Sequence, residues 1–174
     1  MERILLSKRL IFLDRAKKEV REMANMIQQT YDRLKKIPGG HFLFSQFIGY
    51  AAPYSGTIYP DVEELKEGYA RVSMKDRRHL RNHLKSIHAI AMMNLAELAT
   101  GLAVNYGLPE NARGILTHLA IEYKKKARGT LTAECFCTVP TNNTRTEYEV
   151  TAEIKDKEKH VVAIAKAKWL VGPS

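Results

Sequence analysis

The chain has 174 residues, a hydrophobic content of 45% and a formal net charge of +9. This length is enough for one domain with a substantial core, and the composition is ordinary for a globular protein. The positive charge indicates either an anionic partner, such as nucleic acid, anionic lipid or a phosphorylated cofactor, or a basic surface without a specific partner.

Residues 4–36 are expected to form a basic amphipathic helix. Apolar residues recur there at spacings near three and four, and Lys and Arg fill much of the other face. Such a helix can bind a membrane surface, but packing on its own domain or on a partner subunit is the commoner arrangement. Its acidic residues argue against an organellar presequence, and no cleavage site of a secretory signal is evident. We expect residues 1–38 to be a helical extension and residues 39–174 to be the main domain.

A short helix and one strand are expected next. Residues 41–49 form an apolar stretch long enough for a helical turn or two, and residues 53–61 are rich in turn formers. Residues 64–74 alternate with a period of two, which is typical of a strand. Residues 75–83 are predicted to be a polar loop.

The chain is organised around residues 81–104, which start basic and become almost wholly apolar. Ala and Leu dominate, both strong helix formers, and a helix that is apolar nearly all round is a buried helix. A membrane span is not expected, because Asn94 and Glu97 would be costly in lipid and the apolar run is short for a bilayer. The sequence therefore predicts a central helix that carries the carboxylate of Glu97 into the interior.

Strands are expected to fill the rest of the chain. Their ranges are 112–127, 130–139, 144–156 and 160–171. In the first range, one face should carry Ile115, Thr117, Leu119, Ile121 and Tyr123. The short turns between successive ranges predict an antiparallel meander. One strand, a buried helix and a sheet that curls over it make an α+β fold.

Two cysteines lie in the second of these ranges. Cys135 and Cys137 are two residues apart, so their side chains should point to one face of the sheet. Free thiols in a reducing cytoplasm are the simplest interpretation. A metal site would need two more ligands, and none is evident at a suitable spacing, so no metal is expected.

The order of elements resembles the hotdog fold, in which an antiparallel sheet wraps around a long helix; here an extra N-terminal helix precedes it. Residues 82–97 (NHLKSIHAIAMMNLAE) resemble the helix-entry segment of PaaI-type acyl-CoA thioesterases. Those enzymes carry an Asn, a His-Gly-Gly and an acid at the spacings of Asn82, His88 and Glu97. From about residue 39 to residue 170, the chain looks like a poorly characterised branch of that superfamily. The resemblance implies a cytoplasmic acyl-CoA thioesterase that forms a homodimer or homotetramer, with its active site between subunits.

The resemblance also implies roles for individual residues. Glu97 would activate water as a general base or attack the thioester directly. The N–H of Ala89 at the helix N-terminus and the side-chain amide of Asn82 would stabilise the oxyanion. His88 belongs to the motif, although a structural hydrogen bond suits it better than a role as base. The alternatives are that Glu97 pairs with a basic group across a subunit interface and that Asn82 caps the loop or the helix.

Two features depart from the family pattern. His88-Ala89-Ile90 replaces His-Gly-Gly, and the added side chains should narrow or displace the acyl pocket. The family often has a Ser or Thr on the strand after the helix that positions the water, whereas here Leu116 takes that place. Thr117 is the adjacent candidate, although it would face the other way.

The densest run of charge consists of Lys124, Lys125, Lys126 and Arg128. Coenzyme A carries a pyrophosphate and a 3′-phosphate that this run could bind, and a solvated strand end is the alternative. Coenzyme A enters here as part of the substrate, and no separate cofactor is expected.

Other functions remain open. The departures from the family pattern favour a non-catalytic protein that binds acyl-CoA or fatty acyl groups. A hydratase or dehydratase would recruit His88 beside the acid. Nucleic-acid binding is suggested by charge alone, because no recognisable reading motif accompanies it.

Overall fold

Residues 26–34 form a helix that packs on the domain that follows it. The structure is a computed structural model that describes residues 26–109, 111–139, 141 and 143–173. Of the helix predicted over 4–36, residues 26–34 are helical and residues 4–25 lie outside the described ones. The ring of Tyr31 meets that of Phe44 edge-on at 4.9 Å between centroids, and its hydroxyl accepts a hydrogen bond from the N–H of Leu65 at 3.0 Å.

Two short helices lie between this segment and the sheet. They are α2 (Gly40–Ala51), which confirms the helix predicted over 41–49, and α3 (Pro53–Gly56). The hydroxyl of Ser45 in α2 accepts a hydrogen bond from the N–H of Val62 at 2.8 Å, which fixes α2 against the first strand.

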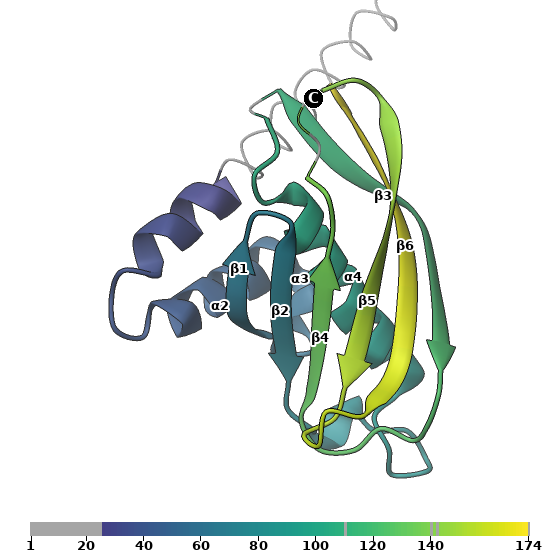
Figure 1. The fold of residues 1–174 in the computed structure, drawn as a ribbon. Coiled ribbons are helices and arrows are strands. Elements are labelled where there is room, and N and C mark those ends of the chain that lie inside the picture. The colour runs from purple at the N-terminus through teal and green to yellow at the C-terminus, as the bar shows by residue number, and fades with distance from the viewer. Residues whose placement is uncertain (1–25, 110, 140, 142, 174) are drawn as a thin grey trace, which may run out of the picture.

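The strands form one antiparallel sheet in the order β1-β2-β4-β5-β6-β3, with β1 and β3 at its edges (Figure 1). Their bounds are β1 (Asp61–Lys66), β2 (Tyr69–Met74), β3 (Ala112–Tyr123), β4 (Leu131–Phe136), β5 (Thr146–Lys155) and β6 (Val161–Pro173).

The single strand predicted over 64–74 is wrong, because two strands lie there. β1 and β2 pair as a hairpin whose turn contains Gly68 at φ 69°. This conformation favours glycine, since side chains clash with the backbone at positive φ. The alternation seen in the sequence belongs to β2 alone. The turn at Gly68, which separates β2 from β1, was not recognised in the sequence.

The predicted meander is wrong at its first step. β3 pairs with β6 at the far edge of the sheet, whereas β4 pairs with β2. The segment between them, residues 124–130, is held across the end of the sheet. The carbonyl of Ala127 accepts a hydrogen bond from the N–H of Ile87 at 2.9 Å, and the N–H of Gly129 donates to Asp76 at 3.0 Å. From β4 onward, the strands follow one another as predicted.

A bulge in β3 changes which residues face the core. Leu116 pairs with Trp169 and His118 with Lys168, so that Thr117 is extra in the ladder. As a result, Leu116, Leu119 and Ile121 pack against the core. The five residues predicted to share one face therefore do not share it, because Ile115, Thr117 and Tyr123 are exposed.

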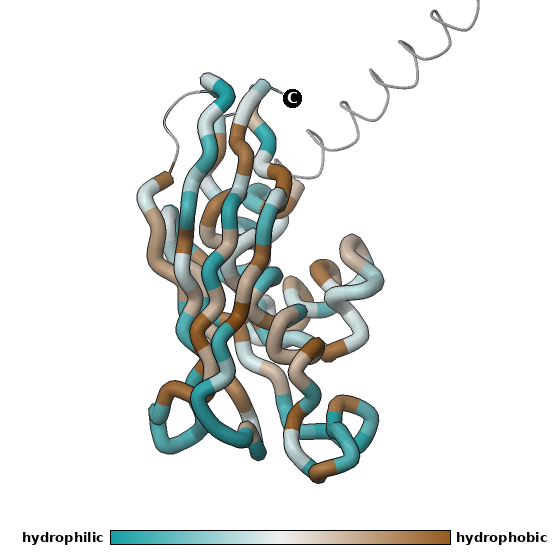
Figure 2. Tube along the Cα trace, turned by 90° about the vertical axis from the view of Figure 1, so that its right-hand side faces the viewer, coloured by the Kyte–Doolittle hydropathy of each residue, from teal (hydrophilic) through white to brown (hydrophobic). Residues whose placement is uncertain are grey.

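The central helix is α4 (Ala89–Asn105), preceded by a short 3-10 helix, η1 (Arg78–Leu80). Small residues face one another across the helix–sheet interface, and this lets α4 lie close to the sheet. The fully buried ones are Ala96, Ala99 and Ala103 on α4 and Ala163, Ala165 and Ala167 on β6. In Figure 2 the strands form one layer and the helices lie against one side of it. This sheet wrapped around a long helix is the hotdog fold.

Within the described ranges, no helix has the length and apolar character needed to cross a membrane.

Candidate active site

Glu97 lines a cavity of about 390 Å³ between α3, α4 and β3. Its neighbours on α4 fall at spacings of three, four and seven residues, which place them on one face of the helix. The lining residues are Tyr54, Ser55, Ile90, Met93, Asn94, Glu97 and Leu119. A mostly apolar cavity that holds one carboxylate is suited to proton transfer.

Burial controls the protonation of this carboxylate. It raises the pKa of Glu97 above the usual range, because desolvation disfavours the charged form. Among the described residues, no cation or hydrogen-bond donor contacts the carboxylate to offset this cost. An ionised Glu97 is therefore a stronger base than a solvated glutamate.

The N-terminus of α4 holds the groups expected to meet an oxyanion. His88 is the N-cap, and its Nδ1 accepts a hydrogen bond from the N–H of Ile90 at 3.1 Å, which gives it a structural use. The N–H of Ala89, in contrast, has no acceptor within the described part of the chain. The hydroxyl of Tyr123 donates to the carbonyl of Ala89 at 3.0 Å and ties the end of β3 to this first turn.

Asn82 shapes the loop that leads into α4. Ser86 still belongs to this loop, and α4 begins three residues later. The Oδ1 atom of Asn82 accepts from the N–H of Leu84 at 2.9 Å and from both the N–H and the hydroxyl of Ser86. A bridge between Arg81 and Ile87 closes the turn. The Nδ2 atom of Asn82 has no acceptor among the described residues, so its N–H groups can still donate to a ligand.

These two groups of residues lie at different places along α4 and its entry loop. Ala89 is the first residue of α4 and Asn82 lies in the loop before it, whereas Glu97 is two turns further along, roughly 12 Å from Ala89 along the axis. Neither Asn82 nor Ala89 lines the cavity, which reaches the first turn of α4 only through Ile90.

Thr117 does not line the Glu97 cavity. The bulge turns its side chain outward, where Oγ1 donates to the backbone carbonyl of Lys168 at 3.0 Å. From β3 the cavity receives Leu119 instead, so this strand supplies no hydroxyl to it.

The basic run divides into two pairs. Lys124 forms an ion pair with Glu122, and Lys125 with Asp156 at 2.8 Å. Lys126 and Arg128 are exposed and make no ion pair within the described ranges.

Lys126 and Arg128 flank Ala127, whose contact with Ile87 brings them to the loop before α4. The exposed Arg77 and Arg78 belong to that same loop, a connection that the sequence did not indicate. Four exposed basic residues thus lie near the N-terminus of α4, and one of them, Arg77, stacks on the ring of Tyr59.

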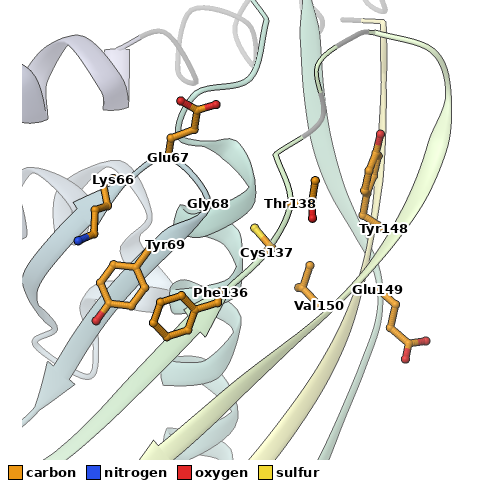
Figure 3. A pocket seen from close by; sticks show the side chains of 10 residues that line it. All are labelled: Lys66, Glu67, Gly68, Tyr69, Phe136, Cys137, Thr138, Tyr148, Glu149 and Val150. Carbon is orange, nitrogen blue, oxygen red and sulfur yellow. The ribbon is translucent and has the colours of Figure 1, made fainter.

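A second, larger hollow of about 760 Å³ lies at the other end of the sheet (Figure 3). The β1–β2 turn lines one side of it and β5 the other, with Cys137 and Thr138 between them. None of the predicted site residues lines it. Cys135 and Cys137 are both free thiols, and both pack against the core, which agrees with the shared face that their spacing predicted.

Three side chains in the β5–β6 turn come close enough together to hold a metal ion. Atoms of Asp156, Glu158 and His160 lie within 4.8 Å of one another. Asp156, however, already accepts the N–H groups of the other two and pairs with Lys125. Its bonds account for the cluster as part of the turn.

A family model described as a domain of unknown function (DUF4442) matches residues 40–171. A search of curated proteins found no match. The structural-genomics protein APC5556 is 29% identical with a TM-score of 0.75, and the match covers 86% of this chain and 99% of that one.

Two more distant structures share the fold. PA5026 of Pseudomonas aeruginosa, a probable thioesterase, is 18% identical with a TM-score of 0.67, and the match covers 79% of this chain and 97% of that one. The thioesterase SAV0944 of Staphylococcus aureus is 14% identical with a TM-score of 0.62, and the match covers 70% of this chain and 100% of that one.

Proposed function

Because this chain belongs to the DUF4442 family and has the hotdog fold, we propose that it is a thioesterase that hydrolyses acyl-CoA. The thioesterase names of PA5026 and SAV0944 support the reaction class. The observation that carries the proposal is the carboxylate of Glu97, which lies in an apolar cavity with its pKa raised by burial.

The active site is assembled from two subunits. Ala89 lies roughly 12 Å from Glu97 along α4 and does not line its cavity, which favours oxyanion donors from a second copy. β3 supports this assembly, because it is a twelve-residue edge strand whose unpaired backbone groups favour pairing with another strand. A symmetric homodimer then contains two such sites.

Hydrolysis follows from these groups. Glu97 takes a proton from water as the water oxygen bonds to the thioester carbon and the carbonyl electron pair moves to oxygen. The oxyanion is held by the N–H of the partner's Ala89 and by Nδ2 of the partner's Asn82. When the carbonyl re-forms, the C–S bond breaks and the thiolate of coenzyme A leaves with its electron pair, to be protonated from Glu97.

The nucleotide of coenzyme A binds the unpaired basic residues beside α4. Lys126 and Arg128 can each give a charge-assisted hydrogen bond to a phosphate without first breaking an ion pair. Lys124 and Lys125 are already paired and contribute less.

The test is thiol release from a panel of acyl-CoA thioesters of different chain lengths and with aryl groups, for the parent protein and Glu97→Gln. We expect the parent to hydrolyse part of the panel and the variant to lose about a hundredfold or more in kcat. Equal rates for the two folded proteins would overturn the role of Glu97.

One observation favours the second candidate, a protein that binds acyl-CoA without hydrolysing it. Ile90 lines the cavity and is 49% exposed, at a position where the resembling family has glycine. If this side chain keeps the thioester away from Glu97, the protein will bind coenzyme A and leave the whole panel intact.

A further inference from the structure

Asn94 is buried beside Glu97 with half of its amide group unused. It is 6% exposed and lies one helical turn before Glu97, and both side chains line the same cavity. Its Nδ2 donates to the backbone carbonyl of Tyr54 at 3.1 Å. Its Oδ1 is buried and has no hydrogen-bond partner among the described residues.

The orientation of this amide is fixed by chemistry. A backbone carbonyl can only accept, so the nitrogen of Asn94 must face Tyr54 and the oxygen must face away from it. A buried carbonyl oxygen without a partner costs free energy and is rare in folded proteins. Asn94 and Glu97 line the same cavity, so the unused oxygen points to a hydrogen-bond donor on the molecule that enters, which reaches it by a small shift of the side chains that now cover it.

We propose that Asn94 positions the attacking water, an inference that rests on the proposed thioesterase function. Residues three apart on a helix have Cβ atoms about 5–6 Å apart, a spacing that one water can bridge. One hydrogen of the water goes to Glu97 during attack, and the other stays bonded to Oδ1 of Asn94. The lone pair of the water is thereby directed at the thioester carbon.

This assignment accounts for the missing hydroxyl on β3. Leu119 reaches the cavity from that strand and Thr117 turns away from it, so β3 offers no acceptor for the water. The acceptor comes instead from α4, the helix that carries the base, and both contacts to the water are fixed to one rigid element.

The test compares Asn94→Ala with Thr100→Val in the full-length protein. Thr100 is buried on the same helix, but its hydroxyl donates to the backbone carbonyl of Glu97 and does not line the cavity. We expect Asn94→Ala to lower kcat about tenfold to a hundredfold with KM nearly unchanged. The midpoint of the pH–rate profile of Asn94→Ala should equal that of the parent, because the base is still Glu97. The control Thr100→Val should keep the parental kcat.

A double variant separates positioning from packing. If Asn94 and Glu97 act on the same water, Glu97→Gln with Asn94→Ala should be no slower than Glu97→Gln alone. Losses that multiply, or a folded Asn94→Ala with the parental kcat, would overturn the proposal. Should Asn94→Ala fail to fold, Asn94→Leu, which keeps the shape of the side chain without an acceptor, takes its place with the same criteria. A parent protein that hydrolyses no thioester, in contrast, would overturn the proposed function itself and this inference with it.

Discussion

Ala89 and Glu97 stand eight residues apart on α4, which separates them by roughly 12 Å along the helix axis. An oxyanion donor must lie about 3 Å from the oxygen it stabilises, and the base must reach a water next to the same carbonyl carbon. This separation favours a site in which Glu97 of one subunit acts with the donors of a second, the arrangement proposed above.

Mixing two inactive variants tests this arrangement. Asn82→Asp keeps the oxygen that holds the loop and removes the amide donor, whereas Glu97→Gln removes the base. In a hybrid dimer of the two variants, one site carries both defects and the other carries none. Subunits exchanged at equal amounts should recover about a quarter of the parental activity, because half of the dimers are hybrids with one intact site. Sedimentation should show a dimer or tetramer; a monomer, or no recovery on mixing, would contradict the shared site.

The buried carboxylate of Glu97 should lower the folding stability of the protein at neutral pH. Its folded-state pKa lies above the value of about 4.3 expected for an unfolded chain, so folding stability falls as pH rises through the interval between the two values. Gln cannot ionise, and Glu97→Gln should therefore have the higher Tm at pH 7. The difference should vanish below pH of about 4, and each kcal/mol corresponds to roughly 2–4 °C for a domain of this size.

The same ionisation should appear in the kinetics. Because Glu97 acts as base only when ionised, kcat should rise with pH through a midpoint above that of an ordinary glutamate. A pH–rate profile measured with one acyl-CoA checks this. A flat profile between pH 4 and 8, with hydrolysis intact, would assign the base to another group.

The sequence predicted whether a segment is a helix or a strand better than it predicted which strands pair with one another. The apolar run of α4 and the alternation in β4, β5 and β6 are local patterns, and they identified those elements. Strand pairing is not local, so the partner of β3 could not be read from alternation. The hairpin before the helix was missed because the alternation is regular only in β2, whereas a bulge between Val62 and Glu64 disturbs it in β1.

The candidate site was predicted only in part, because some of its contacts join residues that are far apart in the sequence. The spacing of Asn82, Ala89 and Glu97 was visible in the sequence, but the cavity was not. Thr117 was selected by position along β3, and a bulge of one residue turned it outward. Asn94 had a visible signal, since it is a polar residue three before Glu97 in an apolar run. Its unused oxygen depends on Tyr54, which is forty positions away in the sequence.

The basic residues should separate into two functional pairs. Replacing Lys126 and Arg128 by Ala should raise KM for acyl-CoA severalfold to about tenfold per lost phosphate contact, and leave the rate with a short acyl-pantetheine thioester unchanged. Replacing Lys124 and Lys125 is the control, because their ion pairs with Glu122 and Asp156 make them less available. Equal effects of the two pairs, or equal losses on both substrates, would contradict a phosphate-binding role.

Two glycines allow the tight packing of the β1–β2 hairpin to be measured. Gly68 and Gly129 have nearly the same backbone conformation, with φ 69° and 71°. An added Cβ at Gly129 would meet no atom within 4 Å, whereas one at Gly68 would lie 2.3 Å from the carbonyl oxygen of Cys137. That oxygen belongs to the backbone, and the N–H of Cys137 is bonded to Gly68 at 2.8 Å, so the contact cannot relax cheaply.

A positive φ destabilises both Ala variants by about 1–2 kcal/mol, and the lower conformational entropy of the unfolded chain stabilises both. These contributions cancel in the comparison, and the steric contact at Gly68 remains. We therefore expect Gly68→Ala to lower the free energy of unfolding by about 1–3 kcal/mol more than Gly129→Ala does, the usual cost of overpacking. Urea denaturation of the two variants measures the difference. Equal stabilities would mean that the hairpin and the end of β4 are free to move apart.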